Sequence, residues 1–168
     1  MTTPEIQRRA DSYFTNKGYF ADSCLGAGTQ GTVFVANILS QTSAPFEQVA
    51  VKIHARQIAY DRELLVYLRL KDLEISHVCG HRIPILVDHD DDLLAIEMTI
   101  VSPPFCLDFG GAYLDRPPDY SPEVWADWHK QKSEAFEDDW PATLNIIRTL
   151  ENYGIFIADV NPGNIKFR

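Results

Sequence analysis

The chain has 168 residues, of which 45% are apolar and 23% charged, and this is the composition of a folded globular domain. A chain of this length buries enough surface to be stable without disulfides or metal ions. Acidic side chains outnumber basic ones by 24 to 15, and the net charge of -9 disfavours nucleic acid and anionic membranes as partners. No apolar stretch approaches the roughly 20 residues of a membrane span. Three widely spaced cysteines and the lack of a signal-peptide pattern predict a reducing, cytoplasmic setting.

The N-terminal part of the chain has the pattern of helices combined with an antiparallel sheet. Apolar spacing indicates the helices, and runs of β-branched and aromatic residues bounded by turn residues indicate the strands. The elements expected in chain order are a helix over 4–16, hairpin strands over 19–24 and 32–38, a strand over 48–53, a helix over 57–70, a loop over 77–82, and paired strands over 83–87 and 93–100.

Beyond residue 101 the chain changes to proline-rich loop and helix, which we interpret as a second layer of the same domain. Ser121, Pro122 and Glu123 have the residue types of a helix start, and this helix is expected to reach Phe136. Apolar spacing predicts another helix over 142–153, ended by Gly154.

Aromatic residues gather on or just beyond the first of these helices: Trp125, Trp128, Phe136 and Trp140. They could form buried core, or an exposed stripe that docks a protein partner or a second copy of the chain. The large area that a tryptophan buries favours the core.

Gly26, Gly28 and Gly31 form the pattern Gly-x-Gly-x-x-Gly. Strand-forming residues follow the last glycine, which excludes a dinucleotide-binding unit, where a helix would start at that point. There is also no Gly-Lys-Ser or Gly-Lys-Thr of a nucleoside-triphosphatase P-loop. Between two strands, the glycines would let backbone N–H groups approach a polyphosphate, with Val33 against a purine ring, although an ordinary flexible hairpin has the same pattern.

Lys52 ends the strand Val49-Ala50-Val51-Lys52 and is expected to point beneath the glycine hairpin. A buried lysine is costly unless it meets anions. Glu63, on the helix that follows, is the candidate counter-ion, although taken alone it has the pattern of a solvent-facing helix carboxylate. We predict that the two side chains come within salt-bridge distance, or within reach after a modest shift of the helix.

These motifs, in this order, resemble the N-terminal lobe of the protein kinase-like superfamily. Residues 25–33 resemble its glycine loop, residues 49–52 its strand with the phosphate-binding lysine, and Glu97-Met98-Thr99-Ile100 the entry to its hinge, whose backbone meets adenine. The resemblance implies ATP and Mg²⁺ as ligands. The nucleotide-binding residues that it implies are Gly26, Gly28, Gly31, Val33, Ala50, Lys52, Glu63, Glu97 and Met98.

The segment Asp159-Val160-Asn161-Pro162-Gly163-Asn164 is similar to the family's catalytic loop. The resemblance implies Asp159 and Lys52 as catalytic residues, with Asp159 the base and Asn164 a Mg²⁺ ligand. It also implies a single α+β, kinase-like domain over 1–168. After an N-terminal helix in 1–18, this has a five-stranded antiparallel sheet with one packed helix in 19–100, then a hinge and a truncated helical lobe in 101–168.

The chain departs from the family at the catalytic loop and beyond it. The bracing His-Arg of the family is replaced in Ile157-Ala158-Asp159, and its loop lysine is replaced by Asn161. The tripeptide Asp108-Phe109-Gly110 precedes the loop, out of the family's order, and we expect a coincidental loop sequence because a metal-binding Asp108 would require a rearranged chain path. The sequence ends at Arg168, before the family's own Asp-Phe-Gly segment.

Two functions remain open from the sequence. The first is an ATP-binding protein with weak or absent phosphoryl transfer, a pseudokinase-like nucleotide sensor or protein-binding module. The second is an active small kinase for proteins or small molecules, with Asp159 as base and Asn164 on magnesium. The missing family residues favour the first function, and the retained Lys52, Glu63, Asp159 and Asn164 favour the second.

Overall fold

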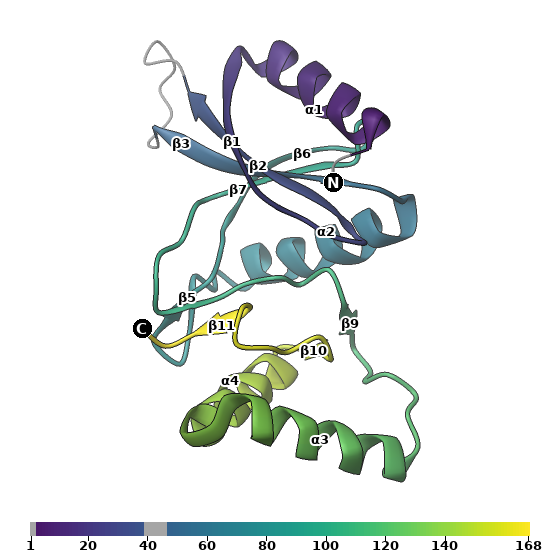
Figure 1. Cartoon of the computed structure of the whole chain (residues 1–168), viewed down its shortest axis with the longest axis vertical. Coiled ribbons are helices and arrows are strands. Elements are labelled where there is room, and N and C mark those ends of the chain that lie inside the picture. Colours follow the sequence, from purple (N-terminus) through teal and green to yellow (C-terminus); the bar gives the residue numbers. More distant parts are fainter. Residues whose placement is uncertain (1–2, 39–46) are drawn as a thin grey trace.

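The computed structural model describes residues 3–38 and 47–168 and has an α+β fold (Figure 1). Its elements in chain order are α1 (Pro4–Lys17), β1 (Tyr19–Ala27), β2 (Gly31–Ile38), β3 (Gln48–His54), α2 (Gln57–Asp72), β4 (His77–Val78), β5 (His81–Arg82), β6 (Leu86–Asp90), β7 (Ala95–Met98), β8 (Phe105–Cys106), β9 (Ala112–Leu114), α3 (Pro122–Phe136), the 3-10 turn η1 (Glu137–Asp139), α4 (Trp140–Asn152), β10 (Ile155–Ile157) and β11 (Ile165–Lys166). None of the helices in the described ranges has the length and apolar character needed to cross a membrane.

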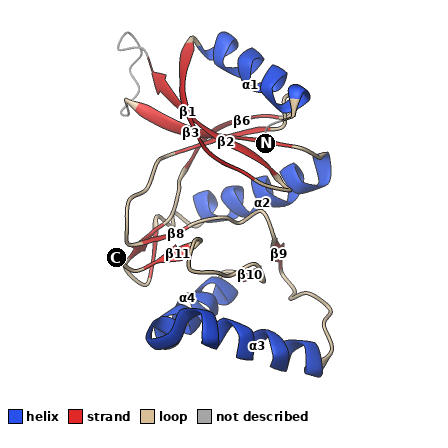
Figure 2. Ribbon diagram, in the orientation of Figure 1, coloured by secondary structure: helices blue, strands red, loops and turns tan. Residues whose placement is uncertain are grey.

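The predicted five-stranded antiparallel sheet is confirmed, with the strand order β1-β2-β3-β7-β6 (Figure 2). Successive side chains of a strand point to opposite faces, and β3 shows this clearly. Val49, Val51 and Ile53 join a hydrophobic cluster with α1, whereas Ala50 joins the larger cluster on the α2 side. Lys52 therefore shares its face with α2.

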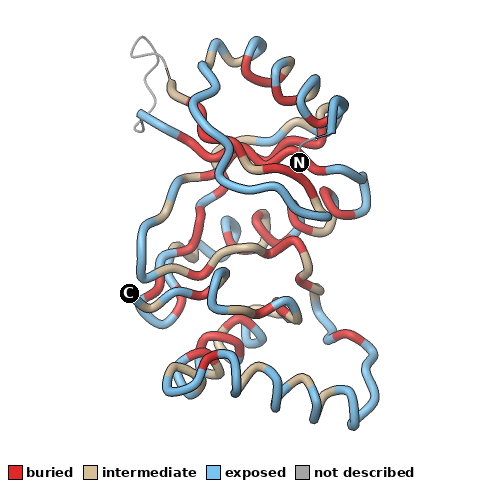
Figure 3. The backbone as a smooth tube through the Cα atoms, in the orientation of Figure 1, coloured by how far each residue is buried: buried red, intermediate tan, exposed pale blue. Residues whose placement is uncertain are grey.

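The prediction of one helix packed on this sheet is wrong, because α1 covers one face and α2 the other (Figure 1). Thr3 caps α1 by accepting from the Ile6 N–H at 3.3 Å, and Gly18 ends it in the left-handed conformation with a φ of 68°. The face of α1 that meets the sheet buries Ile6, Ala10, Tyr13 and Phe14, and its outer face is exposed (Figure 3). Burial of Ile6 and of Phe14 stabilises the fold by roughly 1.5–3 kcal/mol each.

The glycine hairpin is tighter than expected, since β1 extends to Ala27 and β2 begins at Gly31. Only residues 28–30 remain as the tip, and register shifts in β1 lie between Ala21 and Ser23 and between Cys24 and Gly26. Gly31 packs directly on β3: a Cβ added there would lie 2.2 Å from the Ile53 carbonyl oxygen. No other residue fits at this position without moving the hairpin away from β3.

The C-terminal part forms a second layer under α2, built from short strands and two helices (Figure 2). The predicted helices over 121–136 and 142–153 are observed as α3 and α4, with ends that differ by a residue or two. The segment 77–82 is not a plain loop but carries the paired strands β4 and β5. The larger hydrophobic cluster runs from the α2 face of the sheet, at Met98, into this layer, at Leu150.

Two strand pairs join distant parts of the second layer. Strand β11 pairs with β8 and β10 pairs with β9, both antiparallel. The chain segment that follows β7 therefore lies beside the segment that follows α4. These two pairs determine which polar residues meet beneath the sheet.

Candidate functional site

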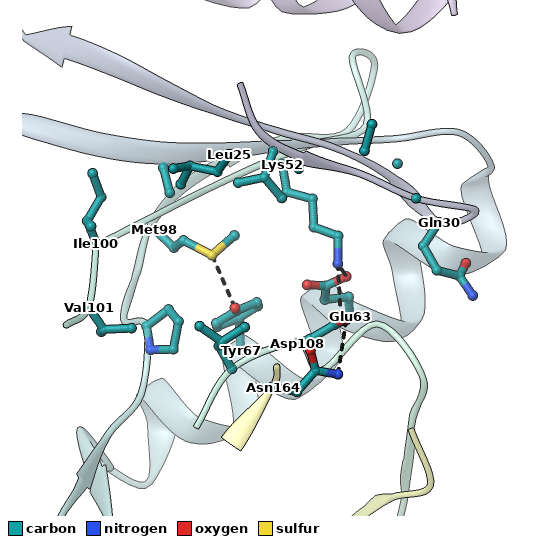
Figure 4. Close-up of a pocket in the computed structure, with 18 of the residues that line it drawn as sticks. Leu25, Gln30, Lys52, Glu63, Tyr67, Met98, Ile100, Val101, Asp108 and Asn164 are labelled. Carbon is teal, nitrogen blue, oxygen red and sulfur yellow. Dashed lines mark hydrogen bonds and ion pairs between the residues drawn. The ribbon is translucent and has the colours of Figure 1, made fainter. Parts of the chain in front are cut away.

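A cavity of about 570 Å³ lies between the α2 face of the sheet and the second layer (Figure 4). The glycine hairpin, β3, α2, the segment after β7, the segment after β8 and the loop after β10 all contribute to its lining. One end is apolar, with Leu25, Met98, Ile100 and Val101, and the other end carries charged and amide side chains: Lys52, Glu63, Asp108 and Asn164. Val33, Ala50 and Asp159 also line the cavity.

Most of the residues singled out from the sequence line this one cavity: Gly26, Gly28, Gly31, Val33, Ala50, Lys52, Glu63, Met98, Asp159 and Asn164. A Cβ added at Gly26 or Gly28 would meet no other atom within 4 Å. These two glycines therefore leave the hairpin backbone uncovered along the cavity.

Glu97 is the exception, because its side chain does not line the cavity. It is fully buried on the α1 side of the sheet, where the Tyr13 hydroxyl donates to it at 2.6 Å and the Tyr19 hydroxyl at 3.1 Å. The Lys17 ammonium lies 3.8 Å away. Burial and the neighbouring Glu97 carboxylate raise the pKa of Tyr19 to about 12. The Glu97 carboxylate is thus bound by residues of α1 and the start of β1. Of the neighbouring residues Glu97 and Met98, only Met98 lines the cavity.

The predicted Lys52–Glu63 salt bridge is confirmed, with Lys52 Nζ 2.7 Å from Glu63 Oε2 and side chains 10% and 1% exposed. Burial by itself lowers the pKa of Lys52, but the Glu63 and Asp108 charges outweigh it and the pKa is raised. Burial likewise acts to raise the pKa of Glu63, but Lys52 and His54 outweigh it and the pKa is lowered. Both groups are therefore charged at neutral pH.

Sequence reasoning missed His54, which supports Glu63 from the other side. His54 is fully buried, and its Nε2 lies 2.8 Å from the same Glu63 Oε2 that binds Lys52. Because an ionised carboxylate only accepts hydrogen bonds, this ring nitrogen carries the proton. The alternation of side chains along a strand could have indicated this contact, because His54 follows Lys52 by two residues and therefore shares its face of β3.

The Asp108-Phe109-Gly110 tripeptide was expected to be a coincidental loop sequence, but the structure brings Asp108 to the polar end of the cavity. Asp108 Oδ1 lies 3.3 Å from Lys52 Nζ, and Asp108 Oδ2 accepts from Asn164 Nδ2 at 3.5 Å. Phe109 is fully buried, with its ring 5.6 Å from that of Tyr67 on α2. The pairing of β8 with β11 brings Asp108, which follows β8, close to Asn164, which precedes β11.

Gly110 fits closely against the ion pair. A Cβ at this position would lie 2.9 Å from Glu63 Oε2 and 3.1 Å from Lys52 Nζ. The Gly110 N–H also donates to Asp108 Oδ1 at 3.2 Å. A glycine at this point lets the backbone that carries Asp108 lie directly under the Lys52–Glu63 pair.

The loop after β10 presents Asp159 with its side chain exposed toward the cavity. The Asp159 carbonyl accepts from Asn164 Nδ2 at 3.1 Å. The Asn161 side-chain oxygen accepts from the Gly163 N–H at 2.9 Å and so holds the turn. Asp159 and Asn164 are thereby kept on the same side of one compact turn.

The described residues of the cavity offer too few ligands to bind a metal ion without help from another molecule. No cluster of three or more His, Cys, Asp or Glu side chains with metal-binding geometry occurs within residues 3–38 and 47–168. Asp108 and Asn164 together offer a carboxylate and an amide oxygen, which are ligands that Mg²⁺ accepts when phosphates and water complete the shell.

Replacing Glu63 by glutamine should weaken the acid dependence of stability. The pKa of Glu63 is lowered below its ordinary value of 4.5, so its ion pair contributes stability that is present above pH 4.5 and is lost as the pH falls. In Glu63→Gln this acid-sensitive part should disappear, and stability at neutral pH should fall by about 3–5 kcal/mol, the loss typical of breaking a buried pair. Urea unfolding from pH 3 to pH 7 measures both effects.

Glu151→Gln is the matched control, since Glu151 is an exposed glutamate at the end of α4. It should leave the pH profile unchanged. If the stability of Glu63→Gln fell with decreasing pH as much as that of the wild type, the buried ion pair would not be the cause of the acid sensitivity.

The chain matches no protein-family model, and a search of curated proteins finds no match. The function is therefore argued from the geometry of the cavity and the charges that line it.

Proposed function

We propose that the chain is a protein kinase-like nucleotide-binding protein that binds ATP together with Mg²⁺. The observation that carries the proposal is the convergence of Lys52, Glu63, Asp108 and Asn164 at one end of a cavity whose other end is apolar. These residues come from β3, α2, the segment after β8 and the loop before β11. The glycine hairpin lies over them, as a phosphate-binding backbone would.

The apolar end has the character of a slot for a nucleobase. The cavity volume falls within the range of small-ligand pockets, and Val33, Ala50 and Met98 of the sheet line it together with Val101 of the segment after β7. The Tyr67 hydroxyl donates to Met98 Sδ at 3.2 Å and closes the far side of the slot. A flat aromatic base would bury its faces there and leave its sugar directed toward the polar end.

The charge balance of the polar end argues for a metal ion. Lys52 is the only cation among the described lining residues, whereas Glu63, Asp108 and Asp159 are carboxylates. A triphosphate alone would be repelled by this excess of negative charge at close range. A divalent cation held by Asp108, Asn164 and the phosphates would offset the repulsion. ATP binding should therefore depend on Mg²⁺.

Within this proposal, phosphoryl transfer is weak or absent. The loop lysine that would accompany Asp159 is replaced by Asn161, whose side chain is occupied by the Gly163 N–H. One observation favours an active kinase as the second candidate: Asp108 adjoins Asn164 and could supply a metal ligand that the motif order seemed to lack. In that case Asp159 would accept the proton of an acceptor hydroxyl.

Thermal denaturation with ATP and Mg²⁺, added separately and together, tests the proposal. At a concentration of 100 times the dissociation constant the stabilisation should be about 2.7 kcal/mol. It should appear fully only with both ligands present, and a protein that shows no shift with both would overturn nucleotide binding.

Asp159→Asn separates the two candidates. Binding should persist in this variant, because Asp159 would act on an acceptor rather than on bound ATP. Phosphate transfer to water, protein or small hydroxyl compounds by the wild type, lost in Asp159→Asn, would establish the active kinase. Binding without transfer would support the nucleotide sensor or scaffold.

A further inference from the structure

An aromatic cluster on α3 holds Trp128 in one orientation. The Trp128 ring lies 5.5 Å from Trp125, 5.0 Å from His129 and 6.2 Å from Trp140, in edge-to-face geometry in each case. Trp128 and Trp140 also pack against the larger hydrophobic core, and Phe136 is buried in it. Phe136 is thus part of the core, as the sequence favoured, and Trp128 and Trp140 border it, whereas Trp125 is not among the described residues packed against it. The ring contacts fix the direction of the Trp128 indole N–H.

That N–H reaches the loop after β10. Trp128 Nε1 donates to the Ala158 carbonyl oxygen at 2.9 Å, in a partly buried position. This carbonyl belongs to the peptide unit that leads into Asp159. The next carbonyl, that of Asp159, accepts from Asn164 Nδ2. Two successive peptide units are therefore held, one from α3 and one from within the loop.

Near the contact with Trp128, few other groups among the described residues hold the loop after β10. Ile157 and Ala158 carry no side-chain donor or acceptor, and Val160 is buried as an apolar anchor. The Asn164 carbonyl accepts from the Leu107 N–H at 2.8 Å, which joins the loop to the residue before Asp108. A rotation of the peptide before Asp159 would therefore be transmitted to Asn164 and to its contact with Asp108.

We propose that Trp128 is a positioning residue: its indole N–H fixes the peptide plane before Asp159 and so keeps Asp159 and Asn164 aligned with Asp108. The effect on ligands rests on the proposed function, whereas the effect on the loop does not. Trp128 itself is not among the described residues that line the cavity.

Trp128→Phe tests this directly, since phenylalanine retains an aromatic ring in the cluster and removes the donor. Trp125→Phe is the matched control on the same helix, because no hydrogen bond of the Trp125 indole occurs among the described residues. The first measurement is amide hydrogen exchange of unliganded protein over 159–166. We expect severalfold faster exchange in Trp128→Phe, and wild-type rates in Trp125→Phe. Equal rates in both variants would overturn the proposal.

The second measurement compares two probes, Mg²⁺-ATP and adenosine. Loss of one positioning hydrogen bond should raise the dissociation constant of Mg²⁺-ATP by about two- to tenfold. Adenosine, which has no phosphates, should bind Trp128→Phe and wild type equally. Equal weakening of both probes would assign Trp128 a structural role only. If the wild type binds neither probe, the proposed function fails and hydrogen exchange alone decides on Trp128.

Wild-type protein provides a measurement that does not depend on folding of the variant. The indole N–H of Trp128 should exchange with solvent more slowly than that of Trp125, as followed by NMR of the tryptophan side chains. Similar exchange rates for the two indoles would contradict the hydrogen bond and with it the proposal.

Discussion

Replacing Lys52 by alanine should abolish the stabilisation of the protein by Mg²⁺-ATP. Lys52 is the only cation among the described residues of the cavity, and phosphates would meet it in the bound ground state. Without it, Glu63 and Asp108 face the phosphates unopposed. The expected loss is the full ligand-induced gain of about 2.7 kcal/mol at 100 times the dissociation constant. The shift in melting temperature on adding Mg²⁺-ATP measures it.

The unliganded Lys52→Ala protein should itself be less stable, because a buried carboxylate loses its partner. The quantity to compare is therefore the ligand-induced shift of each protein, not its melting temperature. Lys71→Ala, at an exposed position in the last turn of α2, should retain the whole shift. A full shift in Lys52→Ala would contradict a phosphate site at the end of β3.

Asp108→Asn should remove the Mg²⁺ dependence of nucleotide binding. The substitution keeps the shape of the side chain but takes away the one carboxylate that contacts both Lys52 and Asn164. Loss of a metal ligand should weaken binding of Mg²⁺-ATP by at least about tenfold. Binding of ATP without metal should become stronger, because one negative charge leaves the polar end. Calorimetric titration with ATP, in Mg²⁺ or in EDTA, measures both changes.

The opposite signs of these two changes distinguish a metal ligand from a residue that merely supports the fold, since unfolding would weaken both. Asp119→Asn is the control, at an exposed aspartate before α3 that does not line the cavity. Unchanged affinity for Mg²⁺-ATP in Asp108→Asn would show that the metal is held elsewhere.

The sheet and the Lys52–Glu63 pair could be predicted from the order of the motifs together with the strand-rich first half of the chain, since a buried lysine needs a counter-ion and Glu63 lies on the next helix. The alternation of side chains along a strand explains the error at Glu97. Neighbouring residues of β7 point to opposite faces, so Glu97 and Met98 cannot both line one cavity. The apolar face of α1 was visible in the sequence, but nothing local indicated that the outer face of the sheet would receive it.

The position of Asp108 could not be predicted from local pattern. Strands β8 and β11 have two residues each, too few to show a period, and their pairing joins segments far apart in the chain. The role of Trp128 is hidden for a similar reason, because its partner is a backbone carbonyl of Ala158, which has no sequence signature. Tertiary pairing, not residue type, brings these groups together.

The pairing of β8 with β11 and of β9 with β10 also sets an order of assembly. The sheet with α1 and α2 is built from segments before residue 99, so the sheet side of the cavity can form while the chain is still being synthesised. Asp108 gains its hydrogen-bonded partner strand only after residues 165–166 have folded onto residues 105–106. Such long-range closure is slow, and its loop entropy must be lost before any contact is gained. A nascent chain therefore acquires the sheet, with its Lys52–Glu63 pair, well before Asp108 and Asn164 meet beneath it.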